Sequence, residues 1–222
     1  MMGSMNKIIH RQDIVEYKNF ISKDACNKLI KYFNTDESLW QDTCFYRSSV
    51  MNLLDPLDKY SGSMINEEYF RNMRQELWAL AEDACGVRLK NLTFSAARWV
   101  EGAYANAHSD NSELDGTPNA WQDNKFVTII YLNDEYEGGE LVFDNHGLEI
   151  SPEIGSVVAF DPGIKNVHSV NKINDGVRYT MLASWDYADV QYTEDQLHAM
   201  RLEKELMKPK QEEQRMSWKV EG

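Results

Sequence analysis

The spacing of hydrophobic residues changes along the chain and divides it into a helical part and a β part. Apolar residues recur at steps of three and four in residues 22–33 and 66–85. This period predicts two amphipathic helices that lie against a sheet. From Leu92 the period becomes two, and apolar and polar residues alternate as far as Val100. Alternation of this kind predicts a strand with one buried face.

Short β-rich segments follow, separated by turns that contain Gly, Pro or Asn. The predicted strands are 126–132, 140–143, 148–150, 156–160, 166–173 and 177–185, with one more inside 12–21 before the first helix. Short strands at this spacing are typical of a sandwich or a barrel. We therefore predict a mainly β protein with flanking helices, whose strands form a sandwich or a barrel.

A third helix is predicted near the C-terminus, where Thr193 and Gln196 form a capping box. Its packed face is predicted to contain Ala199, Leu202 and Leu206. No repeat or linker interrupts the chain, so we expect one domain over residues 1–222. Its expected parts are a vector-derived tag (1–6), a helical support (11–91), a β core (92–187), and a helix with a polar tail (193–222).

Composition restricts the partners of the protein. Hydrophobic residues make up 42% and charged residues 27%, as in soluble globular proteins. The net charge of −13 disfavours nucleic acid, because nucleic-acid affinity depends largely on Lys and Arg. No apolar run approaches the ~18 residues that cross a bilayer, so no membrane association is expected. The N-terminus also lacks the hydrophobic core of a secretory signal.

Three widely spaced cysteines, Cys26, Cys44 and Cys85, form no Cys-x-x-Cys pair. An odd number at such spacing argues against a disulfide framework and against a zinc site. We therefore expect a reducing, cytoplasmic location. The oligomeric state is left open by the sequence.

The candidate chemistry lies in four residues. His108-Ser109-Asp110 is followed 58 residues after the Asp by His168, and ten residues later by Arg178. Two imidazoles and one carboxylate are the ligand set of the facial triad of non-haem Fe(II). Arg178 lies in a largely apolar segment, where a guanidinium needs a partner such as a bound carboxylate.

Each of these residues alone has a simpler explanation. His-x-Asp can be a strand end with a solvated carboxylate, His168 a structural histidine, and Arg178 a surface ion pair. Their combination and order make the metal site the stronger hypothesis. The remaining histidines are given no role, and His146 is assigned to solvent at a hairpin tip.

The segments around these residues resemble the Fe(II)- and 2-oxoglutarate-dependent dioxygenases, in particular the prolyl 4-hydroxylase-like branch. The resemblance rests on an ordered set of motifs in residues 98–110, 128–143, 152–160 and 168–179. It covers about 80 residues from His-x-Asp through Tyr-Leu-Asn and Gly-Gly-Glu-Leu to the final His and Gly-x-Arg.

The resemblance implies a double-stranded β-helix, or distorted jelly roll, with Fe(II) held by His108, Asp110 and His168. It implies that 2-oxoglutarate chelates the iron and places its distal carboxylate on Arg178. Candidates for additional co-substrate contacts are Tyr131 and Thr128. Because they are three residues apart on one predicted strand, their side chains point to opposite faces, and only one can face the pocket. O₂ is the second co-substrate, and ascorbate is expected to support turnover.

The activity implied is hydroxylation of an aliphatic carbon, foremost a prolyl residue in a peptide or protein, with release of succinate and CO₂. The substrate-binding candidates are Arg98, Trp121, Tyr46 and Arg47, the last three in irregular stretches (38–52 and 111–124). Two enzymatic alternatives are an oxygenase of a small molecule such as a free amino acid, and a nucleic-acid demethylase, which the charge disfavours. A third alternative is a non-catalytic metal-binding jelly roll.

Overall fold

The computed structural model describes residues 5–43, 45–53, 65 and 67–220. Three helices are present in this part of the chain, namely α1 (Lys23–Phe33), α2 (Glu67–Cys85) and α3 (Glu194–Val220). The first strands are β1 (Asn6–Arg11), β2 (Ile14–Lys18), β3 (Gln41–Asp42), β4 (Tyr46–Asn52), β5 (Leu89–His108) and β6 (Phe126–Tyr131). They are followed by β7 (Tyr136–Gly138), β8 (Leu141–Phe143), β9 (Leu148–Ile150), β10 (Val157–Phe160), β11 (His168–Val170) and β12 (Ile173–Tyr187).

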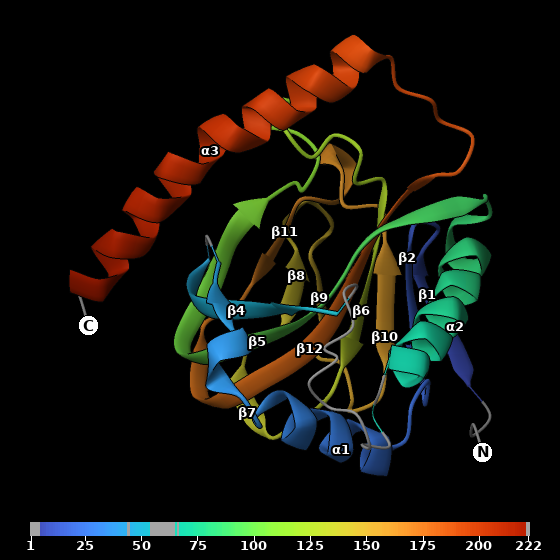
Figure 1. Ribbon diagram of the computed structural model, residues 1–222. Coiled ribbons are helices and arrows are strands. Elements are labelled where there is room, and N and C mark those ends of the chain that lie inside the picture. The colour runs from blue at the N-terminus through green and yellow to red at the C-terminus, as the bar shows by residue number, and fades with distance from the viewer. Residues whose placement is uncertain (1–4, 44, 54–64, 66, 221–222) are drawn as a thin grey trace.

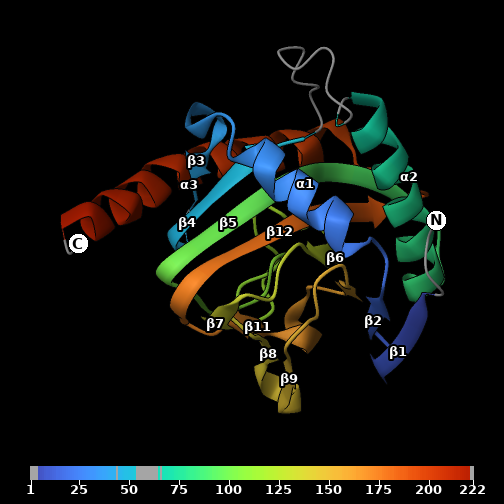
Figure 2. The same cartoon turned by 90° about the horizontal axis from the view of Figure 1, so that it is seen from below.

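The strands form one curled antiparallel sheet in the order β1-β2-β10-β6-β12-β5-β11-β8-β9. Most neighbours in this order are far apart in the sequence, so the chain crosses over repeatedly. β5 and β12 are the longest strands and pair side by side along most of their length. At its C-terminal end β5 pairs with β11, so that β11, β8 and β9 fold back under the main sheet (Figure 2).

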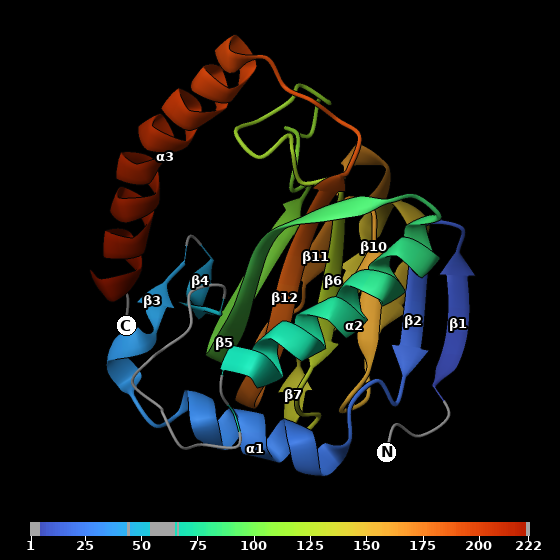
Figure 3. The same cartoon turned by 45° about the vertical axis from the view of Figure 1, so that its right-hand side comes forward.

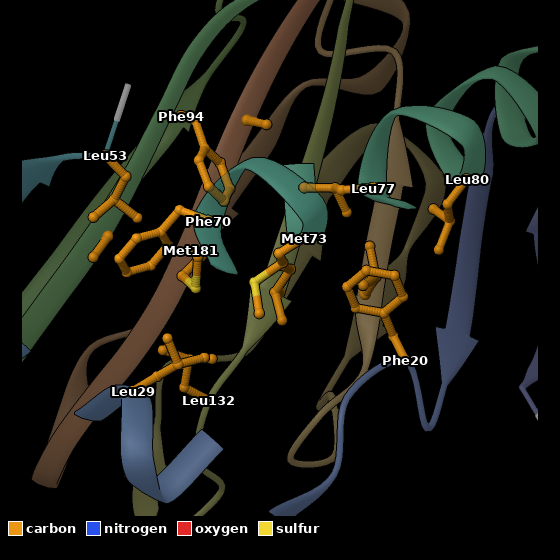
Figure 4. Packing of buried hydrophobic residues seen from close by; sticks show 14 of the residues in the cluster. Phe20, Leu29, Leu53, Phe70, Met73, Leu77, Leu80, Phe94, Leu132 and Met181 are labelled. Carbon is orange, nitrogen blue, oxygen red and sulfur yellow. The ribbon is translucent and has the colours of Figure 1, made fainter. Parts of the chain in front are cut away.

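Helices α1 and α2 cover the outer face of the main sheet (Figure 3). The apolar stripe of α2 contains Phe70, Met73, Leu77 and Leu80, which are all buried. Figure 4 shows Phe70 near Phe94 of β5 and Met181 of β12, and Leu80 on the side of Phe20, and all of them belong to one cluster. The three-and-four spacing of the helix and the alternation of the strands therefore meet in one hydrophobic core.

The inner face of the curled sheet is also apolar. Alternate residues of β6, Val127, Ile129 and Tyr131, belong to a second cluster that lies inside the curl with Phe143 and Phe160. The strands at the centre of the sheet are thus buried on both faces. This explains why residues 126–131 form a continuous apolar run in place of a clean alternation.

The predicted helix starts agree with the structure where they lie in the described residues. Ser22 caps α1, and its hydroxyl oxygen accepts a hydrogen bond from the Ala25 N–H at 3.2 Å. Thr193 and Gln196 exchange the two hydrogen bonds of a capping box at the start of α3. The predicted cap of α2, Asn66, lies outside the described residues.

The N-terminal part contributes four strands to the sheet in addition to α1 and α2. β1 already begins at Asn6, inside the stretch interpreted as a tag, and pairs with β2. β4 pairs with β5 and extends the sheet beside it. β2 lies in the predicted strand segment 12–21, whereas no strand is predicted over β1.

The third helix also differs from its prediction. α3 continues through Pro209 to Val220, where a polar tail was expected. Its predicted apolar face is exposed, with Leu202 at 53% and Leu206 at 64% of their maximal exposure, whereas Met200 is buried. Figure 1 shows α3 reaching across the open end of the sheet. Lys204 of α3 pairs there with Asp123 of the 111–124 loop at 3.4 Å.

None of the described helices combines the length and the apolar character that crossing a bilayer requires.

Truncation of the fully buried Leu77 should test the contact between α2 and the sheet. We expect Leu77→Ala to lower the free energy of unfolding by about 2–5 kcal/mol, through lost burial and the cavity left behind. Urea denaturation measures the loss, with the exposed Glu68→Ala on the same helix as control. A loss no larger than that of the control would contradict this packing.

Candidate metal centre

The two histidines of the predicted triad lie opposite each other on neighbouring strands. His108 is the last residue of β5 and His168 the first residue of β11, and the antiparallel register pairs them directly. Their ring centroids are 4.3 Å apart. The sheet thus brings together two imidazoles that are 60 residues apart in the sequence.

Asp110 completes the cluster from the loop after β5. Its Oδ1 atom lies 3.4 Å from Nε2 of His108 and 3.4 Å from Nε2 of His168. The possible ligand atoms of the three residues all lie within 4.8 Å of one another. They converge on one point, as three ligands of a single ion must.

Both imidazoles have the tautomer that metal binding requires. Nδ1 of His108 contacts the carbonyl oxygen of Asn106 at 2.7 Å, and Nδ1 of His168 that of Asn166 at 3.0 Å. A carbonyl oxygen can only accept, so each Nδ1 carries the proton and donates it. The lone pair of each Nε2 is therefore free to point at an ion.

Asparagines of the 111–124 loop hold Asp110 in place. Asn124 Nδ2 donates to Asp110 Oδ2 at 3.1 Å, and Asn119 Nδ2 donates to the Asp110 carbonyl at 3.1 Å. Burial disfavours a charged carboxylate, but His108 and His168, when protonated at Nε2, donate to Asp110 and outweigh the effect of burial, so that the pKa of this carboxyl is lowered. The group is thus a carboxylate, with Oδ2 occupied by the amide and Oδ1 left for a metal.

The donor set fits a divalent transition ion. Two neutral imidazoles and one carboxylate on the same side of a site are the ligands of non-haem Fe(II), and they leave further positions open. When bound, such an ion together with a 2-oxo acid and O₂ supplies the oxidation of an unactivated carbon. The residues described here supply the ligands and their orientation.

An apolar cavity of about 220 Å³ extends from the triad into the curl of the sheet. Inward-facing side chains of the central strands line it, including Trp99 of β5 and Ile129 of β6. On one side Phe45 lies 5.1 Å from the His108 ring and stacks on Trp99 at 5.5 Å. Such walls exclude water from the space beside the triad.

Arg178 lies at the cavity and is only 2% exposed. Its Nη2 donates to the Tyr131 hydroxyl at 3.2 Å, and its guanidinium lies near the rings of Tyr131 and Trp99. Its Nε finds no partner, and no described acidic residue pairs with it. A buried cation without an acid partner is unfavourable, so this site fits a bound carboxylate.

Tyr131 stays neutral beside this cation. Burial raises the pKa of its hydroxyl to about 12, against the opposing effect of Arg178. Its oxygen accepts from Arg178, and its own proton remains available for an anionic ligand.

The Gly-Gly pair of the sequence motif is needed for close packing beside Arg178. Gly138 and Gly139 have φ values of +78° and +71°, in the left-handed region. A Cβ on Gly139 would lie 2.3 Å from Ile173 Cδ1 and 3.2 Å from Arg178 Cδ. A larger residue there would displace the Arg178 side chain.

The two threonines near this end of the cavity have different positions. Thr128 faces the outer core, where its hydroxyl accepts a hydrogen bond from Trp185 Nε1 at 3.0 Å, so its prediction as a co-substrate contact is corrected. Tyr131 has the opposite parity and faces Arg178. Thr180, two residues after Arg178 on β12, is buried and lines the cavity. Because Thr180 and Arg178 are two residues apart on one strand, their side chains share a face, and this spacing could have identified Thr180 from the sequence.

None of the substrate-binding candidates whose side chains are described lines the cavity. Arg98 and Trp99 are consecutive on β5, so their side chains point to opposite faces of the sheet. The Arg98 guanidinium lies over the Trp40 ring and forms a bidentate ion pair with Glu37, which places it outside the cavity. Trp121 is half-buried in the 111–124 loop and is not among the lining residues.

The first residues of β4 lie closer to the site. Tyr46 pairs with Tyr104 of β5 through the backbone. Arg47 is exposed with a left-handed φ of +53° at a break in the strand register. Arg47 does not line the cavity, whereas Phe45 does, and the side chain of Tyr46 lies outside the described part of the chain.

Comparison with known proteins agrees with this site. Residues 94–185 match the family model of the 2OG-Fe(II) oxygenase superfamily. Human prolyl 3-hydroxylase 2 is 30% identical over 99 residues, which cover 39% of this chain and 14% of that protein. The chain thus matches about a seventh of the length of that curated relative.

Solved structures agree on the fold. The collagen prolyl hydroxylase of Paramecium bursaria Chlorella virus-1, in a 2-oxoglutarate complex, is 17% identical with a TM-score of 0.60, covering 79% of this chain and 96% of that chain. HygX of Streptomyces hygroscopicus, with nickel, 2-oxoglutarate and hygromycin B bound, is 13% identical with a TM-score of 0.59, covering 83% and 89%.

The fold and the site together define the class of protein. The segment that carries the triad belongs to the 2OG-Fe(II) oxygenase superfamily, and the chain has the double-stranded β-helix fold of its prolyl 4-hydroxylase-like members. His108, Asp110, His168 and Arg178 all lie inside the matched segment, residues 94–185.

Thr128→Val should separate a structural role of this hydroxyl from a role in co-substrate binding. The change leaves the buried Trp185 N–H without its acceptor, so we expect the free energy of unfolding to fall by about 1–3 kcal/mol. The KM for 2-oxoglutarate should stay as in the wild type. A several-fold rise in this KM without a loss of stability would contradict the structural assignment.

Proposed function

We propose that this protein hydroxylates an aliphatic carbon of a prolyl residue in a peptide or protein, using Fe(II), 2-oxoglutarate and O₂, and releases succinate and CO₂. The observation that carries the proposal is the single apolar cavity that contains both the His-Asp-His cluster and the buried Arg178. A dicarboxylate that reaches from the cluster to Arg178 would place one end on the metal ion and pair its distal carboxylate with the guanidinium.

The protein's own residues bind and orient the reactants. His108, Asp110 and His168 would hold the ion through two nitrogens and one oxygen. Arg178 and the Tyr131 hydroxyl would hold the distal carboxylate, with Thr180 as a further hydrogen-bonding group on the same strand face. Since a guanidinium and a carboxylate pair in a bidentate manner, this contact also fixes the direction of the co-substrate.

The aromatic wall of the cavity favours an apolar substrate carbon. Phe45 and Trp99 stack on each other next to His108, and a pyrrolidine ring is an apolar group of suitable shape for such a surface. The names of the similar proteins, prolyl 3-hydroxylase and collagen prolyl hydroxylase, support the same substrate. The similar proteins include both a prolyl 3-hydroxylase and a prolyl-4-hydroxylase of Pseudomonas putida, so the position on the ring stays open in this proposal.

A small-molecule substrate is the second candidate. HygX, which has a similar fold, is described with hygromycin B bound. The two candidates differ in what must reach the cavity, an extended chain or a compact molecule. We keep the peptide as the main proposal, because the sequence relatives are prolyl hydroxylases.

A reducing, cytoplasmic location is part of the proposal. Cys26 and Cys85 are free thiols in the described part of the chain, as expected where disulfides do not form. Ascorbate is proposed to support turnover.

The activity is tested by incubating the protein with Fe(II), 2-oxoglutarate and ascorbate, with succinate followed by NMR. Proline-containing peptides and, separately, free amino acids are then added and examined for a product heavier by one oxygen atom. A hydroxylated peptide supports the main proposal, and a hydroxylated free amino acid supports the alternative. Metal binding without succinate under every condition would support a non-catalytic jelly roll.

Asp110→Ala removes the carboxylate ligand of the cluster. We expect loss of tight metal binding and of succinate production, because two imidazoles alone do not complete the facial set. Metal content after dialysis against Fe(II) or Co(II) gives the binding, and the NMR assay gives the turnover. Full succinate production by this variant would refute the metal centre.

Arg178→Ala removes the partner of the distal carboxylate. The loss of one member of a buried charge pair costs about 2–5 kcal/mol, so the concentration of 2-oxoglutarate needed for half-maximal turnover should rise by roughly 30-fold or more. Arg98→Ala is the matched control, since Arg98 pairs with Glu37 outside the cavity. Equal 2-oxoglutarate dependence in both variants would remove Arg178 from the co-substrate site.

A further inference from the structure

One side chain near the metal centre is buried, fully hydrogen-bonded and absent from the ligand set. Asn166 is 0% exposed and lies two residues before His168, at the end of a short 3₁₀ turn, η4 (Ile164–Asn166). Its carbonyl oxygen is the acceptor for His168 Nδ1 at 3.0 Å. The orientation of the His168 ring therefore depends on where this peptide group is held.

The side chain of Asn166 joins three separate segments. Its Nδ2 donates to Asp13 Oδ2 at 3.0 Å and to the Asp161 carbonyl at 2.8 Å. Its Oδ1 lies 2.8 Å from His146 Nε2. Since the amide oxygen can only accept, His146 is the donor.

These partners come from distant parts of the sequence. Asp13 lies in the turn between β1 and β2, Asp161 directly follows β10, and His146 ends the 3₁₀ turn η3 (Asp144–His146) before β9. His146 was assigned to solvent from its place at a hairpin tip, and its half-buried contact with Asn166 corrects that interpretation. Asn166 is thus fixed by both layers of the curled sheet.

The other histidine of the cluster has no such support. Its carbonyl acceptor belongs to Asn106, near the exposed end of β5, where the Asn106 side chain is exposed. Both histidines use the carbonyl two residues earlier, but only that of His168 belongs to a buried, anchored residue.

We propose that Asn166 is a positioning residue, whose side-chain hydrogen bonds hold its carbonyl so that His168 Nε2 points at the metal. Asp13 and His146 act through Asn166, and none of the three touches the ion. This inference rests on the metal centre and does not depend on which substrate is hydroxylated.

The expected size of the effect follows from other metal sites. Residues that orient a ligand through a hydrogen bond change metal affinity by about 10–100-fold when they are mutated. Asn166→Ala keeps the carbonyl but removes all three side-chain contacts, so we expect a loss of affinity of about this size.

The test titrates Co(II) into metal-free protein and follows the visible absorbance of the bound ion. Asn166→Ala should raise the dissociation constant at least about tenfold and change the shape of the spectrum, because the ligand geometry changes. Asn171→Ala is the matched control. Asn171 is an exposed asparagine three residues after His168, and its amide bonds Glu140 at 3.0 Å. Its removal should leave the dissociation constant and the spectrum as in the wild type.

A second pair of variants keeps the test valid if Asn166→Ala does not fold. Asp13→Asn retains an oxygen that accepts from Asn166, whereas Asp13→Ala removes it. We expect wild-type-like Co(II) affinity and spectrum for Asp13→Asn, and weakened binding for Asp13→Ala. All titrations are made well below the melting temperature of the metal-free variant, so that a change reports on the folded site.

The outcomes separate this inference from the proposed function. Wild-type affinity and spectrum in Asn166→Ala, or in Asp13→Ala where the first variant is unfolded, would overturn the positioning role and leave the metal centre intact. Failure of the wild-type protein itself to bind Co(II) or Fe(II) would instead overturn the metal centre and with it the oxygenase proposal.

Discussion

The direct pairing of His108 with His168 is the contact on which the site depends. It joins the end of β5, the longest strand of the main sheet, to the start of β11 in the part that folds back beneath it. A shift of the register by one residue would turn one imidazole away from the other, because side chains alternate across a strand. The closure of the curled sheet and the assembly of the metal ligands are therefore the same structural event.

The cavity is a second consequence of this closure. The central strands bury both faces, one against α1 and α2 and one inside the curl. Inside the curl the walls are apolar, and the described charged groups at the cavity are Arg178 and the metal cluster. An apolar surrounding strengthens electrostatic contacts, so these groups make a selective site for a dicarboxylate. Hydrogen bonds of Asn124 to Asp110 and of Asn166 to His168 hold the ligands in place, and the sequence alone does not reveal these contacts.

The elements and the main site residues could be predicted from the sequence because their signals are local. Ser22 and Thr193 are caps at helix starts, α2 has a continuous apolar stripe, and His-x-Asp places two ligands close together on one segment. The motif order then indicated His168 and Arg178. The opposite parity of Thr128 and Tyr131 indicated that one of them must face away.

What the sequence by itself determined was therefore the kind of fold, the three metal-binding candidates and the arginine. Only the tertiary structure decided that Thr128 faces the outer core, that Arg98 pairs with Glu37, that α3 buries Met200 and exposes Leu202, and that Asn166 supports His168. The physical reason is the range of the interactions. Caps and periodicity act within a few residues, whereas strand order, side-chain partners and burial depend on segments that meet only when the sheet has closed.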